Sequence, residues 1–139
     1  MTVLFLCRQN AGRSQMAQAF FERLAPAGHV GVSGGSSPAA AIHPSVVQVM
    51  GEVGFDLSGR VPRKVDAALL AGADRVISMG CDDPAVCEYP GRKVEDWGIE
   101  DPSGKPIEEV RRIRDLLRDR VAALARRLES DATSAEARA

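Results

Sequence analysis

The fold of this chain is decided by the stretch Thr2-Val-Leu-Phe-Leu-Cys7-Arg-Gln-Asn-Ala-Gly-Arg13-Ser14. Residues 2–6 form a short apolar run, which is typical of a parallel strand that is covered on both faces. Helical periodicity begins directly after the following turn, with apolar residues at Met16, Ala17, Phe20 and Leu24. The stretch therefore predicts a strand, a tight loop and a helix in succession.

Strands and helices alternate along the rest of the sequence. We expect strands over residues 29–33, 75–79 and 93–97, a helix that begins near Pro44 with Val46, Val47, Met50 and Val53 on one face, and a short helix over 66–71. The last helix has the clearest pattern, with apolar residues at Ile107, Val110, Ile113, Leu117, Val121, Leu124 and Leu128. This alternation implies right-handed crossovers and a parallel sheet with helices on both faces, the α/β class.

Size and charge limit what the protein can be. A chain of 139 residues with 45% hydrophobic content suits one globular domain, which we expect over residues 1–130, followed by a frayed tail over 131–139. The formal net charge is -1, so no broad basic field draws in nucleic acid or an acidic membrane. The apolar run at residues 3–6 is too short for a signal peptide or a membrane span. We expect a cytoplasmic monomer whose anion binding is local.

The loop after the first strand has the composition of an oxyanion cradle. Backbone N–H groups between a buried strand and a helix start can point at one small anion. Asn10 and Gly12 tolerate the left-handed conformations of such a tight loop, and the Arg13 guanidinium can hold two oxygens at once. The predicted oxyanion-binding residues are Cys7, Arg8, Gln9, Asn10, Ala11, Gly12 and Arg13.

Cys7 is the predicted nucleophile of this loop. The loop dipoles, with the Ser14 hydroxyl as a hydrogen-bond donor, should stabilise the thiolate, which is the form that attacks. The alternative is that Cys7 ends a buried strand as a small apolar residue, and a cysteine five residues before an arginine is weak evidence alone. The glycine, the asparagine, the serine and the strand-loop-helix setting agree with one another, so we favour catalysis.

Asp101, which precedes Pro102, is the candidate acid. Transfer of an oxyanion to a thiolate expels an oxygen, and a positioned carboxylic acid can protonate it. Trp97 could shield this carboxyl group from water. Asp-Pro also commonly initiates an ordinary turn, and only the neighbouring Cys7 loop favours the catalytic interpretation.

Cys81 and Cys87 suggest electron transfer, because phosphatase chemistry needs one cysteine. In this hypothesis Cys7 attacks arsenate, Cys81 attacks the adduct and releases arsenite, and Cys87 then takes over the disulfide from Cys7. Two alternatives stay open. A zinc site is one, but the spacing is not that of a short knuckle and neither His29 nor His43 is adjacent in sequence, so we expect no metal. A buried Cys81 that merely continues the third strand is the other.

Several segments together resemble arsenate reductases built on the low-molecular-weight protein tyrosine phosphatase fold. They are residues 3–17, Val32-Ser-Gly-Gly35, Val76-Ile-Ser-Met-Gly-Cys81, Glu95-Asp-Trp-Gly-Ile-Glu-Asp-Pro-Ser-Gly104 and the arginine-rich last helix, in the family's order. The resemblance implies a three-layer, flavodoxin-like α/β/α fold with a four-stranded parallel sheet. It also implies Cys7 as nucleophile, Arg13 as oxyanion clamp, Ser14 as thiolate partner and Asp101 as acid.

Three departures from this family matter. Thioredoxin-coupled members place their redox cysteines one residue further apart, and mycothiol-coupled relatives tend to differ in this loop. The external thiol reductant is therefore open between thioredoxin and mycothiol with mycoredoxin, and we expect no bound cofactor. Members that bind potassium behind the loop carry carboxylates where Gln18 and Arg63 stand, although Asn10 and Ser33 match, so we expect no potassium site. Arg8, next to the nucleophile, widens the positive field at the mouth.

Other functions are weighed against this one. A protein tyrosine phosphatase would let water hydrolyse the Cys7 adduct, but Ser103-Gly104 stands where many of those enzymes have a tyrosine pair, and aromatic residues are only 4% of the chain. A binding module is the other rival, either an oxyanion sensor or a phosphocysteine carrier. Arg13 speaks against the carrier. We assign no ligand to the arginines of the last helix, which suit a solvated, ion-paired face, and no catalytic role to either histidine.

Overall fold

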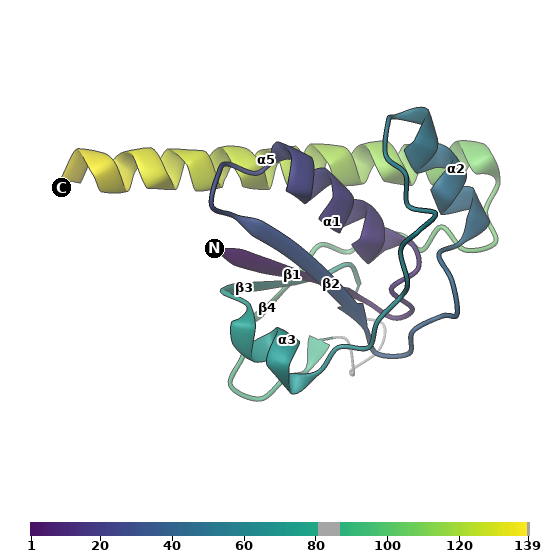
Figure 1. Ribbon diagram of the computed structural model, residues 1–139, viewed down its shortest axis with the longest axis horizontal. Coiled ribbons are helices and arrows are strands. Elements are labelled where there is room, and N and C mark those ends of the chain that lie inside the picture. The colour runs from purple at the N-terminus through teal and green to yellow at the C-terminus, as the bar shows by residue number, and fades with distance from the viewer. Residues whose placement is uncertain (81–86, 139) are drawn as a thin grey trace.

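A computed structural model describes residues 1–80 and 87–138, with the side chains of residues 1–80 and 87–131. Four parallel strands form one sheet in the order β2-β1-β3-β4. Their bounds are Thr2–Cys7 for β1, Val30–Gly35 for β2, Arg75–Ser78 for β3 and Val94–Asp96 for β4. The first strand is therefore central, and it hydrogen-bonds to β2 on one side and to β3 on the other (Figure 1).

Helices cover both faces of this sheet, so the expected three-layer α/β/α arrangement is confirmed. The helices are α1 (Arg13–Leu24), α2 (Pro44–Glu52), α3 (Ala67–Gly72) and α5 (Ile107–Arg138). Helices α1, α2 and α5 lie on one side, and α3 lies on the other (Figure 1). Among the described helices, none combines the length and the apolar character that crossing a bilayer requires.

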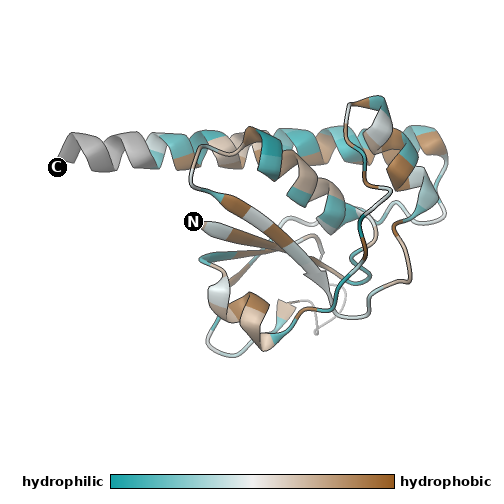
Figure 2. Ribbon diagram, in the orientation of Figure 1, coloured by the Kyte–Doolittle hydropathy of each residue, from teal (hydrophilic) through white to brown (hydrophobic). Residues whose placement is uncertain are grey.

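The alternation of side chains along β1 decides which layer holds Cys7. Val3, Phe5 and Cys7 belong to the main core against α1, α2 and α5, whereas Leu4 and Leu6 pack with Leu69 of α3 and its neighbours. This period of two follows from the pleat of a strand. Apolar residues accordingly fill β1 and the inward side of α5 (Figure 2). Cys7 therefore stands at the carboxyl end of the central strand, on the face of the two longest helices.

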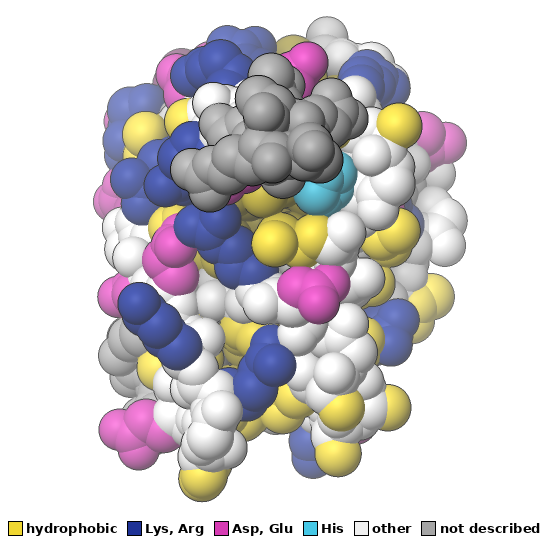
Figure 3. All heavy atoms as spheres, turned by 90° about the vertical axis from the view of Figure 1, so that its left-hand side faces the viewer, with side chains coloured by type: hydrophobic (Ala, Val, Ile, Leu, Met, Phe, Trp, Pro, Cys, Tyr) yellow, Lys and Arg dark blue, Asp and Glu magenta, His cyan; other side chains and the backbone are white. Residues whose placement is uncertain are grey.

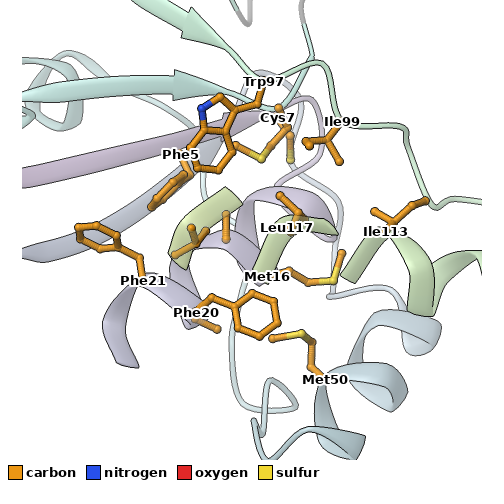
Figure 4. Packing of buried hydrophobic residues seen from close by; sticks show 14 of the residues in the cluster. Phe5, Cys7, Met16, Phe20, Phe21, Met50, Trp97, Ile99, Ile113 and Leu117 are labelled. Atoms are coloured by element: carbon orange, nitrogen blue, oxygen red, sulfur yellow. The ribbon is translucent and has the colours of Figure 1, made fainter. Parts of the chain in front are cut away.

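The helical faces differ from the sequence pattern in one respect. Leu24, expected in the core, is 42% exposed, and Phe21 is fully buried instead. Phe21 meets the ring of Phe5 edge-on at 5.7 Å between centroids (Figure 4). Phe20 meets the ring of Phe55 edge-on at 5.1 Å. Helix α1 starts at Arg13 and is short, so Leu24 ends the helix beyond the edge of its neighbours. In α2, Val46 and Met50 are buried as expected, and Val47 and Val53 pack against the core in part.

Helix α5 shows the expected apolar stripe, from the partly buried Ile107 to the buried Leu128. Its arginine-rich face is largely ion-paired, but Arg114 is only 8% exposed, which corrects the expectation of a wholly solvated face. Arg114 donates to Val49 O and to Glu52, both at 2.9 Å, and so fastens α5 to α2. The helix continues to Arg138, and fraying of residues 131–139 stays a prediction.

Gly35, the last residue of β2, supports the loop that follows β1. Its backbone accepts from Val65 N at 3.0 Å and donates to Arg63 O at 2.9 Å. A Cβ at this position would lie 2.7 Å from Arg8 O and 2.9 Å from Asn10 N. Because both of these atoms belong to the backbone, they cannot rotate out of the way. Only glycine lets β2 approach the loop so closely.

Replacing Gly35 by alanine tests this close approach. Gly35→Ala should lower the free energy of unfolding by about 1–3 kcal/mol, as overpacking does, and should weaken oxyanion binding because the loop must shift. Gly51→Ala is the matched control, since a Cβ there meets nothing within 4 Å. Its helical site gains up to about 1 kcal/mol of stability from alanine. Urea unfolding of both variants gives the comparison, and equal stabilities would contradict the packing argument.

Candidate active site

The loop between β1 and α1 forms the floor of a polar cavity with a volume of about 240 Å³. The cavity lies where ligands bind in open α/β sheets, beyond the carboxyl ends of the strands. It brings together five residues that the sequence singled out for catalysis or oxyanion binding, and it adds three that were not assigned to the site. The lining residues are Cys7, Arg8, Gln9, Arg13, Ser37, His43, Asp101 and Ser103.

The sulfur of Cys7 is held by two polar groups of its own loop. Asn10 N donates to Sγ at 3.2 Å, and Ser14 Oγ lies 2.8 Å from Sγ. Cys7 is 4% exposed and its thiol is free. Ser14 is fully buried beneath the loop and does not line the cavity.

Neighbouring hydrogen bonds decide which way the Ser14 hydroxyl points. Arg63 N, a backbone donor, lies 3.0 Å from Asn10 Oδ1, and this fixes the orientation of the Asn10 amide. Asn10 Nδ2 must then donate to Ser14 Oγ, at 2.8 Å. Once Cys7 is a thiolate, its sulfur can only accept, so the Ser14 hydroxyl then donates to Sγ. The sulfur thus receives two donors, an arrangement that stabilises negative charge on it.

Asn10 can make these bonds because its backbone is in the left-handed region, with φ of 51°. It is the only residue other than glycine with a positive φ in the described part of the chain. Asparagine tolerates this conformation better than most side chains do. The buried Asn10 therefore turns the loop so that its N–H reaches Sγ while its amide holds Ser14.

Arg13 is positioned by the segment after β4. Its Nη1 donates to Ile99 O at 2.7 Å, and the side chain is 7% exposed. Ile99 N in turn donates to Met79 O at 2.5 Å, just past the end of β3. The guanidinium is thereby fixed at the cavity wall with its other N–H groups available for an oxyanion.

Asp101 lines the same cavity, whereas the adjacent carboxylate, Glu100, does not. Asp101 Oδ1 accepts from Ser103 N at 2.9 Å, which closes a small turn. Glu100 is bound outside, by Lys105 at 2.7 Å and by Arg112 at 2.5 Å. Hydrogen bonds from Lys105 and Arg112 lower the pKa of Glu100, so it stays a carboxylate.

Trp97 does not bury the Asp101 carboxyl group, contrary to the expectation that it would shield this group. Asp101 is exposed, and Trp97 turns toward the core, where its ring lies 5.9 Å from Phe5 (Figure 4). Its Nε1 donates to Glu95 Oε2 at 2.8 Å. Water can reach the acid from the open side of the cavity.

His43, Ser37 and Ser103 are cavity residues that the sequence analysis did not assign to the site. The sequence signal for His43 is its position directly before Pro44 at a helix start, which by itself does not place a side chain in a cavity. The backbone of the segment is tied to the loop, with Ser37 N donating to Arg8 O at 2.7 Å and His43 N to Ala11 O at 3.0 Å.

Of the two cysteines proposed for electron transfer, the structure describes only Cys87. Cys81 lies outside the described residues. Cys87 is disulfide-bonded, and its Sγ lies 3.5 Å from Ser78 Oγ at the end of β3. Leu6 of β1 pairs with Ser78 of β3, so this strand end is adjacent to Cys7.

The polar residues behind the loop do not fit a potassium ion. Asn10 Oδ1 already accepts from Arg63 N and from Gln15 Nε2, each at 3.0 Å. Ser33 Oγ donates to Gln18 Oε1 at 2.5 Å. Gln15 Oε1 has no partner among the described residues, but one amide oxygen is not a cation cage. Arg63 meets Asn10 through its backbone N–H group.

Comparison with known proteins agrees with this geometry. The family model described as low molecular weight phosphotyrosine protein phosphatase matches residues 2–134. The chain belongs to this family. The same fold is seen in the arginine phosphatase YwlE from Geobacillus stearothermophilus, with a TM-score of 0.86 and 26% identity over 96% of each chain.

Two other proteins that are similar to this chain are named as arsenate reductases. One is a protein of Halobacterium salinarum to which the name arsenate reductase has been assigned provisionally. It is 45% identical over 84% of this chain and 85% of its own length. The thioredoxin-dependent arsenate reductase of Corynebacterium glutamicum is 34% identical, with a TM-score of 0.76, over 94% of this chain and 62% of that one. Proteins named as phosphatases and as reductases therefore share this fold.

Asp101→Asn tests the acid. The amide cannot protonate a leaving oxygen, so turnover should fall about 100-fold or more, as for other lost general acids, with little change in oxyanion affinity. Glu100→Gln is the matched control, because that carboxylate is tied to Lys105 and Arg112 instead. Steady-state rates of both variants are compared, and equal losses would show that the segment acts structurally.

Ser14→Ala tests the donor to the sulfur. Loss of the hydroxyl removes one of two hydrogen bonds from the thiolate, so alkylation of Cys7 by iodoacetamide at neutral pH should slow several-fold. Mass spectrometry of the peptide that carries Cys7 follows the rate. Ser58→Ala, which removes only a surface hydrogen bond to Asp56, should leave the rate unchanged. An unaltered rate in Ser14→Ala would contradict the assigned hydroxyl direction.

Proposed function

We propose that this protein is an arsenate reductase in which the Cys7 thiolate attacks inorganic arsenate. The observation that carries the proposal is the composition of the cavity around Cys7. The eight described residues that line it are polar or ionisable, none of them is aliphatic, and the imidazole of His43 is the only ring among them. Such polar walls suit a small inorganic oxyanion better than an aryl ester. The names of the Halobacterium and Corynebacterium relatives support the same substrate.

The first step forms a bond between Cys7 Sγ and arsenic and breaks one arsenic–oxygen bond. Backbone N–H groups of the loop and the Arg13 guanidinium hold the other oxygens, where charge develops. Asp101 gives its proton to the departing oxygen, which leaves as water. The product is a covalent adduct of Cys7 with arsenic still in its pentavalent state.

The second step is the reduction. The thiolate of Cys81 attacks Cys7 Sγ, a Cys7–Cys81 disulfide forms, and the electron pair of the sulfur–arsenic bond leaves with arsenic as arsenite. Cys87 then attacks Cys81 and frees Cys7 as a thiolate. Two thiols lose two electrons in total, and arsenate gains them.

Strand register supports this relay. Met79 N donates to Leu6 O at 2.7 Å, so the chain leaves β3 directly beside Cys7, and Cys81 follows Met79 by two residues in sequence. Cys87 Sγ lies at the same strand end, near Ser78.

An external thiol must reopen the final disulfide for another cycle. The thioredoxin dependence of the Corynebacterium relative favours a dithiol protein of the thioredoxin class. Mycothiol with mycoredoxin is the alternative, because such a small thiol could attack the Cys7 adduct directly and make Cys81 and Cys87 dispensable.

A phosphatase that uses Cys7 alone is the second candidate. The likeness to an arginine phosphatase at a TM-score of 0.86 favours it, and the same nucleophile, clamp and acid would serve. In that case water hydrolyses the Cys7 adduct, and the two other cysteines take no part in turnover.

Release of arsenite from one enzyme equivalent separates these functions. Reduced protein is mixed with arsenate without added thiol, and arsenite and remaining thiols are counted. Wild type should release one arsenite per chain and lose two thiols at Cys81 and Cys87. Cys81→Ser and Cys87→Ser should not complete the relay, and Cys7→Ser should release none.

Other outcomes identify the alternatives. Arsenite that appears only with a low-molecular-weight thiol, equally in wild type and both serine variants, indicates that the adduct is resolved by that external thiol. No arsenite under either condition, with aryl phosphate hydrolysis retained, contradicts the reductase and leaves the phosphatase.

A further inference from the structure

His43 lies in the wall of the Cys7 cavity, and its side chain makes no hydrogen bond to the described part of the protein. It lines the cavity together with Arg13 and Asp101. The Cδ2 edge of its ring faces the loop, 3.5 Å from where a Cβ on Gly12 would lie. Pro102, directly after Asp101, lies at the same distance from that point. The imidazole and the acid segment therefore flank the loop residue that precedes Arg13.

The backbone around His43 does not require histidine. His43 N donates to Ala11 O, and His43 O accepts from Val46 N and Val47 N, bonds that most residues could make. His43 occupies the N-cap of α2, but its side chain makes no capping hydrogen bond. No hydrogen bond joins its ring nitrogens to the residues that the structure describes, and the ring is half-buried. The free nitrogens are available to a ligand in the cavity.

The chemistry of the bound oxyanion supplies a partner for this ring. A tetrahedral oxyanion held by the loop and Arg13 turns its fourth oxygen outward, to the side of the cavity where Asp101 lies. In inorganic arsenate or phosphate this oxygen can carry a hydroxyl proton, whereas in a phosphate ester it carries carbon. A neutral imidazole nitrogen can accept a hydrogen bond from the hydroxyl of the inorganic ion, but the ester oxygen has no hydrogen to donate.

We propose that His43 is a specificity-determining residue that accepts a hydrogen bond from the outward hydroxyl of an inorganic oxyanion and so favours it over an ester. The assignment rests on the proposed attack of Cys7 on an inorganic oxyanion. Sites that hydrogen-bond a substrate hydroxyl reject analogues that lack it, because the site's polar group is then left unpaired. The ring also orients the departing oxygen toward the Asp101 carboxyl group.

Protection of Cys7 from iodoacetamide measures this preference without arsenate reduction. Inorganic phosphate and phenyl phosphate are titrated separately, and the concentration that halves Cys7 alkylation is determined for wild type, His43→Leu and His43→Gln. Leucine keeps an apolar side chain without nitrogen, and glutamine keeps an acceptor near the position of Nε2. Because arsenate reduction is not needed, failure of the reductase proposal would not disturb this assay.

His43→Leu should raise the half-protecting concentration of inorganic phosphate about tenfold, as expected for one hydrogen bond to a charged ligand. Phenyl phosphate should protect His43→Leu as well as it protects wild type, and His43→Gln should restore most of the phosphate affinity. Equal weakening toward both ligands would assign His43 a structural role, and thermal unfolding of the variants would show it. No change toward phosphate, or no protection of wild type by phosphate, would also overturn the proposal.

Discussion

The site depends on the left-handed turn at Asn10. With φ of 51°, this one residue aims its backbone N–H at Cys7 Sγ and its amide at Ser14. The amide orientation is set from outside the loop, by Arg63 N. The hydrogen bonds to the sulfur are thus linked to a segment more than fifty residues away, and a shift of that segment would disturb Cys7. The loop is an organised hydrogen-bond network in which each bond orients the next.

The sheet and its helices hold this network in place. Alternation along β1 puts Cys7 on the face of α1 and α5, where Phe5 and Trp97 exclude water from beneath it (Figure 4). Gly35 lets β2 touch the loop backbone, and Ile99 fixes Arg13 from the side of β4. Neighbours from both sides of the central strand therefore converge on one loop, so core packing and anion binding are not separable here.

Much of this could be predicted from local sequence, and the exceptions have physical reasons. The strand-loop-helix signal at residues 2–14 reports neighbours in sequence, so β1, α1 and the loop residues follow from it. The burial of Phe21 in place of Leu24 depends on where α1 ends against β1, which periodicity does not encode. The hydrogen bond from Arg63 to Asn10 and the place of His43 in the cavity wall arise from long-range contacts, which a single sequence does not reveal.

Charge outside the site is largely compensated locally, and this bears on selectivity. Most described arginines of α5 are ion-paired, and basic and acidic side chains are mixed on the face at the amino ends of the strands (Figure 3). The field felt by an anion therefore comes mainly from Arg13, Arg8 and the loop amides. These groups cannot tell arsenate from phosphate, because the two ions share shape and charge. What separates a reductase from a phosphatase must then be the reaction that removes the adduct from Cys7. Reduction is favoured when another thiol reaches Cys7 before water does. The end of β3 beside Cys7 is where the chain can supply that thiol.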